Sequence, residues 1–110
     1  VIGVVINMTE LPLARWSSEQ LEAARKLCYK NNVISDGSLP IILPTDKTFR
    51  VLDLAWTTEK NLLSKDKIDA VIIQGEPCFV YYFVAACKDE AIPCYSPCYE
   101  DSKFVQFRRF

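Results

Sequence analysis

Apolar positions along the chain fall into short continuous runs and longer stretches with helical spacing. Val1 to Met8 (VIGVVINM) is a continuous apolar run rich in β-branched residues, and Ala70 to Ile73 is a second. Strands that are buried on both faces have this composition, as in parallel sheets. We therefore predict a strand at each place. Because no basic leader precedes the first run, the sequence favours a strand there over a signal peptide.

Two stretches between these strands predict helices. Ser17 has the position of an N-cap, with Gln20 three residues later as in a capping box. The apolar face expected for this first helix consists of Leu21, Ala24, Leu27 and Cys28. A second helix is expected to begin near Thr45 or Thr48. Its apolar stripe is Phe49, Leu52, Trp56 and Leu63.

The remaining elements complete an alternating order. Cys78 to Ala91 predicts a third helix, with Pro77 where a first helical turn tolerates proline. Its segment VYYFVAA has no polar face, which is typical of a helix buried on a sheet or at a dimer interface. Further strands are predicted at 39–43, between two prolines, at 92–95 and at 103–110.

The order of strands and helices indicates the fold class. Helices that alternate with strands indicate a mostly parallel sheet with helices on both faces. We predict a single α/β, Rossmann-like domain over residues 1–110, whose last strand is antiparallel at the carboxyl-terminal edge. A chain of 110 residues is long enough for a hydrophobic core of its own.

Composition excludes several classes of function. The formal net charge is −1, so no overall basic field attracts long nucleic acid. No apolar run approaches the length of a membrane span. The chain has no histidine, which removes the commonest general base and most transition-metal sites. Five cysteines at irregular spacing make a poor disulfide framework, and we expect a reducing, cytoplasmic setting.

The turn Gln74-Gly75-Glu76-Pro77 is the first candidate site, because it ends a predicted strand and precedes a helix. Ligands of open α/β sheets bind at the carboxyl ends of strands. Glycine allows unusual backbone angles and close approach of a ligand, and the helix start attracts anions. The alternative is a tight turn without function. The turn matches neither a dinucleotide-binding nor a phosphate-binding loop, and Glu76 disfavours an adjacent phosphate.

Other candidates are weaker. Arg108 and Arg109 point to opposite faces if the tail is a strand, so only one can face a ligand, and both are also compatible with a charged, solvated edge. Trp16, next to Arg15, is suited to stacking on an adenine or to packing before Ser17. Cys78, Cys94 and Cys98 lie where three thiols could share a strand edge, as metal ligands or as spectators.

Several segments, taken in order, resemble one family. These are VVINM, SSEQLEAA, VIIQGEP, IPCYS and KFVQFRRF. They are similar to the small CRISPR-associated Csx proteins of type III systems, a CARF-like group that includes ring nucleases. The similarity covers about two-thirds of the chain and is weak in the middle. No single motif is specific, and the order and spacing carry the resemblance.

The resemblance implies an antiviral function in the cytoplasm. A homodimer would bind a cyclic oligoadenylate, cyclic tetra-adenylate above all, across its twofold axis. Cleavage of that ring switches off the signal, through attack of a ribose 2′-hydroxyl on the neighbouring phosphate to give a 2′,3′-cyclic phosphate. No metal or other cofactor is required. The ligand-binding residues implied or suggested by position are Asn7, Met8, Trp16, Gln74, Gly75, Glu76 and Pro77, and the catalytic candidates are Ser96 and Arg108.

This sequence departs from the family pattern at two places. Family members carry Thr and a basic residue after Tyr-Ser, where this chain has Pro97-Cys98, and the segment 96–103 is short. An Asn-His pair of the first strand is here Asn7-Met8. Both changes are compatible with binding and put cleavage in doubt. The alternatives are a non-catalytic sensor or sponge, a Rossmann-like interaction protein without nucleotide, and a thiol enzyme.

Overall fold

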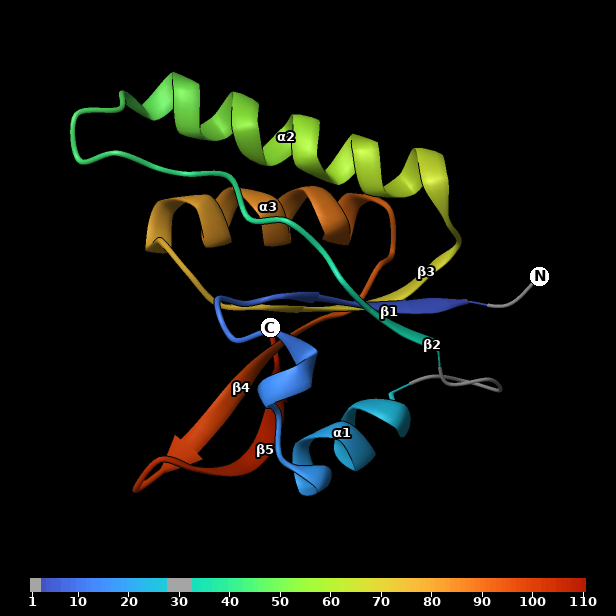
Figure 1. The fold of residues 1–110 in the computed structure, drawn as a ribbon. Helices are drawn as coiled ribbons and strands as arrows, with labels where there is room; N and C mark the ends of the chain where they lie inside the picture. Colours follow the sequence, from blue (N-terminus) through green and yellow to red (C-terminus); the bar gives the residue numbers. More distant parts are fainter. Residues whose placement is uncertain (1–2, 28–32) are drawn as a thin grey trace.

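The structure, a computed structural model, describes residues 3–27 and 33–110 and contains one five-stranded sheet (Figure 1). The strand order is β2-β1-β3-β4-β5. The first four strands of this order pair in parallel, and β5 is antiparallel to β4. The strands are β1 (Val4–Met8), β2 (Val33–Asp36), β3 (Ile68–Ile73), β4 (Cys94–Glu100) and β5 (Lys103–Arg109). The predicted α/β class, the mostly parallel sheet and the antiparallel edge strand are confirmed.

Helices cover both faces of the sheet, as the alternating order predicted. α2 (Thr48–Lys65) and α3 (Pro77–Asp89) lie on one side and pack against each other. α1 (Ser18–Arg25), preceded by the short 3-10 helix η1 (Leu13–Arg15), lies on the other side, against β5 and β2. The N-terminal crossover therefore runs on a different face from the two later crossovers.

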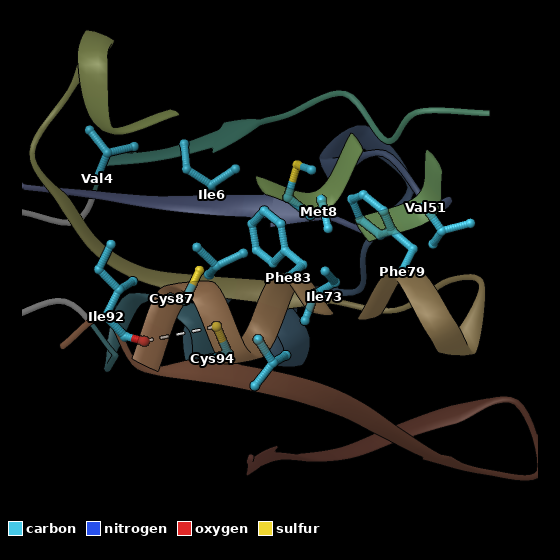
Figure 2. Close-up of a cluster of buried hydrophobic side chains, with 13 residues drawn as sticks. Val4, Ile6, Met8, Val51, Ile73, Phe79, Phe83, Cys87, Ile92 and Cys94 are labelled. Atoms are coloured by element: carbon cyan, nitrogen blue, oxygen red, sulfur yellow. Dashed lines mark hydrogen bonds between the residues drawn. The ribbon is translucent and has the colours of Figure 1, made fainter. Parts of the chain in front are cut away.

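The larger half of the core lies between the sheet and α2 and α3. Alternate residues of β1, among them Ile6 and Met8, face the buried rings of Phe79 and Phe83 (Figure 2). These two rings stack with centroids 5.7 Å apart. Removing such side chains from water stabilises a fold by about 1.5–3 kcal/mol each. The apolar third helix is thus buried along one side, as predicted.

The smaller half of the core lies under α1. Val5, Ala70 and Ile72 face this side, together with Ala24 of the helix and Trp16 just before it. Leu21 and Leu27 pack on the same cluster, which confirms the predicted apolar face, while Cys28 lies outside the described residues.

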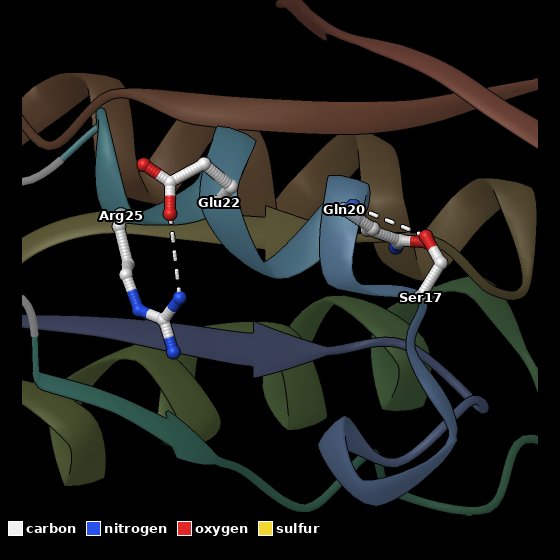
Figure 3. A network of polar contacts seen from close by, with 4 residues as sticks. All are labelled: Ser17, Gln20, Glu22 and Arg25. Carbon is white, nitrogen blue, oxygen red and sulfur yellow. Dashed lines mark hydrogen bonds and ion pairs between the residues drawn. The ribbon is translucent and has the colours of Figure 1, made fainter.

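The amino end of α1 is capped as predicted. The Ser17 hydroxyl accepts a hydrogen bond from the Gln20 backbone N–H at 3.1 Å (Figure 3). This satisfies one of the N–H groups that a helix start leaves without a partner, a contribution of about 0.5–2 kcal/mol. The Gln20 side chain has a different partner, the hydroxyl of Tyr99. At the other end Arg25 pairs with Glu22 at 3.4 Å.

The predicted strand at 39–43 is wrong, and β2 lies a few residues earlier. Val33–Asp36 pairs with Val4–Asn7, whereas residues 39–43 are irregular. Prolines at 40 and 44 lack the N–H that a sheet ladder needs. Leu39 and Ile42 still pack against the core, so this segment shows an apolar pattern without pairing.

The helix at Thr48–Lys65 is confirmed, but most of its predicted stripe faces outward. Phe49, Leu52 and Trp56 are 74%, 47% and 58% exposed. The buried positions are Val51, Ala55 and Glu59. Leu54, Leu62 and Leu63 also pack on the core, so Leu63 is the one residue of the predicted stripe that faces inward.

β4 extends past the predicted residues 92–95 and forms a hairpin with β5. Asp101 and Ser102 connect the strands, and both have positive φ (50° and 64°), as a two-residue type I′ turn requires. The chain between Ser96 and Lys103 is therefore strand and turn, and the structure contains no long loop there.

Candidate functional site

The carboxyl edge of the sheet contains a topological switch point. From β1 the chain crosses to β2 on one side, and it later returns to place β3 on the other side of β1. Met8 pairs with Ile73 at the ends of these two strands, and the Gln74 N–H donates to the Met8 carbonyl at 3.3 Å. In open α/β sheets such a point leaves a crevice in which ligands bind.

A hollow lies at this edge. Its volume is about 470 Å³, and it is lined by Glu10, Leu11, Gln74, Gly75 and Tyr99. Gln74 is exposed, and its side chain has no hydrogen bond to any residue that the structure describes. Two predicted ligand residues thus share one hollow with three residues that the sequence did not single out.

Asn7 is a buried residue that supports the wall of the hollow through hydrogen bonds. Its side chain is 1% exposed. The amide nitrogen donates to the Leu11 carbonyl and to Asp36 Oδ1, both at 2.9 Å. The amide oxygen accepts from the backbone and side chain of Thr9, at 3.1 and 2.7 Å. With these partners Asn7 positions the loop that carries Glu10 and Leu11, and does not itself face a ligand.

Met8 and Trp16 also lie in the interior. Met8 is fully buried in the core under α2 and α3. Trp16 is 6% exposed, its indole N–H donates to the Leu11 carbonyl at 2.9 Å, and its ring lies 6.0 Å from that of Phe107. Of the two roles predicted for Trp16, the structure therefore supports packing, because the buried indole ring has no exposed face on which an adenine could stack.

Glu76 occupies the anion-attracting start of α3. Its carboxylate accepts a hydrogen bond from the Phe79 N–H at 2.8 Å, so the residue is the N-cap of the helix. Pro77 is the first helical residue and has no N–H to offer a ligand. Glu76 thus occupies the Phe79 N–H and adds a negative charge at the helix start, which makes this end of α3 a poor site for a phosphate.

Gly75 is not required by the backbone. Its φ is not positive, so the expected unusual conformation is absent. A Cβ placed on it would meet only Leu39, at 3.7 Å, which is ordinary contact. Packing and conformation therefore permit a larger residue, and the absence of a side chain keeps the hollow open.

Tyr99 is a residue that sequence reasoning missed. Its hydroxyl accepts from Gln20 Nε2 at 3.0 Å and lies 3.2 Å from Gln20 Oε1. The phenol is thereby fixed between α1 and the hollow. A tyrosine near a strand end gives a weak signal, and only the pairing of β4 with its neighbours brings it to this edge.

Ser96 and Arg108 are direct partners in the β4–β5 ladder. Ser96 is half-buried and Arg108 is exposed. Neither is among the residues that line the hollow with Gln74. The predicted site residues therefore lie in two separate places: Gln74 and Gly75 at the β1–β3 switch point, and Ser96 and Arg108 on the β4–β5 hairpin.

The described cysteines, Cys78, Cys87, Cys94 and Cys98, are all free thiols. Cys87 and Cys94 lie in the core (Figure 2), and the neighbouring thiol of Cys94 together with burial raises the pKa of Cys87. Cys78 is exposed at the start of α3. In residues 3–27 and 33–110 no group of three or more His, Cys, Asp or Glu residues could hold a metal ion.

In comparisons with known proteins, no family model, curated protein or solved structure matches the chain. Of the helices that the structure describes, none combines the length and apolar character needed to cross a membrane.

Proposed function

We propose that this chain is a CARF-like, Rossmann-like domain that binds a cyclic oligoadenylate, specifically cyclic tetra-adenylate, at the carboxyl edge of its sheet. The observation that supports this most is the hollow at the β1–β3 switch point. Its wall includes Gln74 and Gly75, the turn that the resemblance to the Csx group assigns to the ligand. Gln74 offers both a donor and an acceptor to a base or a ribose.

The size of the hollow supports a homodimer. A volume of about 470 Å³ is that of a site for one drug-sized molecule, and a ring of four nucleotides is larger. Two hollows that face each other across a twofold axis would accommodate the ring. Since Glu10 is the only charged residue among the described residues that line the hollow, the cations for the phosphates would come from Arg108 or from its equivalent in the second copy.

Ring cleavage is a second candidate, favoured by the pairing of Ser96 with Arg108. A ribose 2′-oxygen would bond to the adjacent phosphorus as the bond from phosphorus to the 5′-oxygen breaks. The 2′-hydroxyl proton would pass to the departing 5′-oxygen by way of water. The Ser96 hydroxyl would hold a phosphate oxygen, and the Arg108 guanidinium would neutralise the charge that develops. No histidine or metal takes part.

Titration calorimetry with cyclic tetra-adenylate tests the binding proposal. We expect low-micromolar affinity for the wild type and a loss of at least about tenfold for Gln74→Ala. Gln106→Ala is the matched control, because Gln106 is an exposed glutamine on β5 that does not line this hollow. Equal weakening by the two substitutions, or no binding by the wild type, would contradict the proposal.

Chromatography of the nucleotide after incubation separates cleavage from binding alone. A linear product that ends in a 2′,3′-cyclic phosphate, lost in Arg108→Ala and retained in Arg109→Ala, supports the ring nuclease. Recovery of the intact ring from a protein that binds it supports a sensor or a sponge. Ligand binding in either case would raise the melting temperature.

A further inference from the structure

A second hollow lies between α2 and α3, away from the carboxyl edge. Its volume is about 240 Å³. Apolar and aromatic side chains form most of its wall, and acidic residues lie at one end. The residues that line it are Leu52, Trp56, Glu59, Lys60, Tyr82, Ala85, Ala86, Asp89 and Glu90.

Glu59 is the unusual residue of this hollow. It is 1% exposed, and neither of its carboxylate oxygens has a hydrogen-bond partner among the described residues. Buried polar groups are almost always paired, because an unpaired one costs about 1–3 kcal/mol and more when it is charged. A buried acceptor that lines a hollow without a partner indicates that a donor from outside enters there.

Lys60 does not supply that donor. Its ammonium pairs with Glu90 at 3.2 Å and lies 5.6 Å from the centroid of the Trp56 ring. Lys60 Nζ lies 4.0 Å from Glu59 Oε1, which is within ion-pair range but too far for a hydrogen bond. The position of Lys60 nevertheless shows that a cation can lie over the Trp56 ring at this hollow, where the aromatic face stabilises it.

We propose that this hollow is a binding site for a guanidinium group on an alkyl stem, with the guanidinium paired to Glu59 and the stem against Trp56 and Tyr82. A planar, weakly hydrated guanidinium suits a buried carboxylate with aromatic walls better than an ammonium does. The volume admits one side chain or one small amine, and is below the range of nucleotide-sized sites. A metal ion would need more oxygen ligands than Glu59 offers.

The environment of Glu59 predicts how binding depends on pH. Burial raises the pKa of its carboxyl group; Lys60 lowers the pKa, and Glu90 and Asp89 raise it further. Tyr82 faces the same hollow, and Cys87 lies close enough for Glu59 to influence it. Because the guanidinium pairs with the ionised carboxylate, affinity should fall as pH decreases through the raised pKa of Glu59.

Agmatine, a guanidinium on a four-carbon stem, is the probe, and n-butanol is the neutral control. We expect saturable, one-site binding of agmatine by calorimetry and by the fluorescence of Trp56. Glu59→Gln should weaken it at least about tenfold, Trp56→Leu by about three- to tenfold, and Lys60→Met should strengthen it by removing a competing cation. Glu90→Gln, at the exposed rim, should have a smaller effect than Glu59→Gln.

Sedimentation velocity identifies the source of the group. If an arginine of a second copy enters the hollow, the wild type self-associates, Glu59→Gln does not, and agmatine dissociates the assembly. If the wild type is monomeric and binds agmatine, a free amine or another protein supplies the group. Equal agmatine binding by wild type and Glu59→Gln, or an equal response to n-butanol, would overturn the proposal. The agmatine results do not bear on cyclic tetra-adenylate binding at the carboxyl edge, whereas a wild type that is monomeric also when cyclic tetra-adenylate is present would contradict the homodimer proposed there.

Discussion

The side-chain amide of Gln20 forms hydrogen bonds with the hydroxyl of Tyr99. The distance from the hydroxyl oxygen is 3.0 Å to Gln20 Nε2 and 3.2 Å to Gln20 Oε1. Gln20 is 2% exposed, so its amide has no access to water as a substitute partner. The contact links the first turn of α1 to the far end of β4, two segments that are 79 residues apart in the chain. It also fixes one wall of the hollow at the switch point.

Tyr99→Phe should therefore lower the free energy of unfolding by about 1–3 kcal/mol, because it leaves the buried Gln20 amide unpaired. Urea unfolding measures this change. Tyr81→Phe is the control, since Tyr81 is 71% exposed and should differ from wild type by no more than about 0.5 kcal/mol. Equal stability of the two variants would mean that water reaches the Gln20 amide.

Gly75→Ala should leave stability unchanged or raise it by about 0.4–1 kcal/mol, since its backbone tolerates a Cβ and alanine restricts the unfolded chain. Gly37→Ala is expected to be destabilising. Its Cβ would overlap Met8 Sδ and come within 2.8 Å of Ile6 Cγ2 in the core. Thermal unfolding should give a lower melting temperature for Gly37→Ala than for wild type and an equal or higher one for Gly75→Ala.

Ala91→Gly should stabilise the protein by about 1 kcal/mol. Ala91 has φ 58° and follows Glu90, the C-cap of α3; the Ile92 N–H donates to the Cys87 carbonyl at 2.9 Å and the Ala91 N–H to the Lys88 carbonyl at 3.1 Å. This arrangement is a Schellman motif, in which glycine avoids the cost of the left-handed conformation. Ala85→Gly, on an exposed turn of the same helix, should destabilise by about 0.5–1 kcal/mol. Denaturant midpoints compare the two.

Glu59→Met should raise stability at neutral pH by about 1–3 kcal/mol, because a buried carboxylate without a hydrogen bond is replaced by an apolar side chain of similar length. The folded pKa of Glu59 is raised by burial, so the folded state holds its proton to higher pH than the unfolded state does. Wild-type stability is therefore lost as pH rises through that window. The advantage of the variant should shrink toward pH 4, as chemical unfolding at several pH values would measure. The exposed Glu22→Met is the control for the introduced methionine and should differ from wild type by no more than about 0.5 kcal/mol at neutral pH.

Continuous burial is what made the central strands predictable. β1 and the last four residues of β3 are buried, so apart from Asn7 these residues are apolar, and they overlap the predicted strands. β2 is a short edge strand that ends in Ser35-Asp36, residues that also suit a loop. The neighbouring segment 39–43 is apolar because it packs on the core, and only the prolines at 40 and 44, which lack the N–H that a sheet ladder needs, distinguish it from a paired strand.

Only the part of the candidate site whose position follows from the order of the strands could be predicted from the sequence. The Gln74-Gly75 turn follows from the end of a central strand, and the structure contains a hollow there. Asn7 and Trp16 both donate to the backbone carbonyl of Leu11, and a backbone acceptor cannot be predicted from residue type. Whether the hollow binds a nucleotide stays a prediction.

The two kinds of strand pairing in the sheet differ in the length of chain that each must close. The β4–β5 hairpin joins neighbours through the two residues Asp101 and Ser102, whereas Met8 meets Ile73 across more than half of the sequence. Closing long loops costs entropy before contacts repay it, and such pairings slow folding. We expect the hairpin to form early during folding and the crevice between β1 and β3 to be completed late.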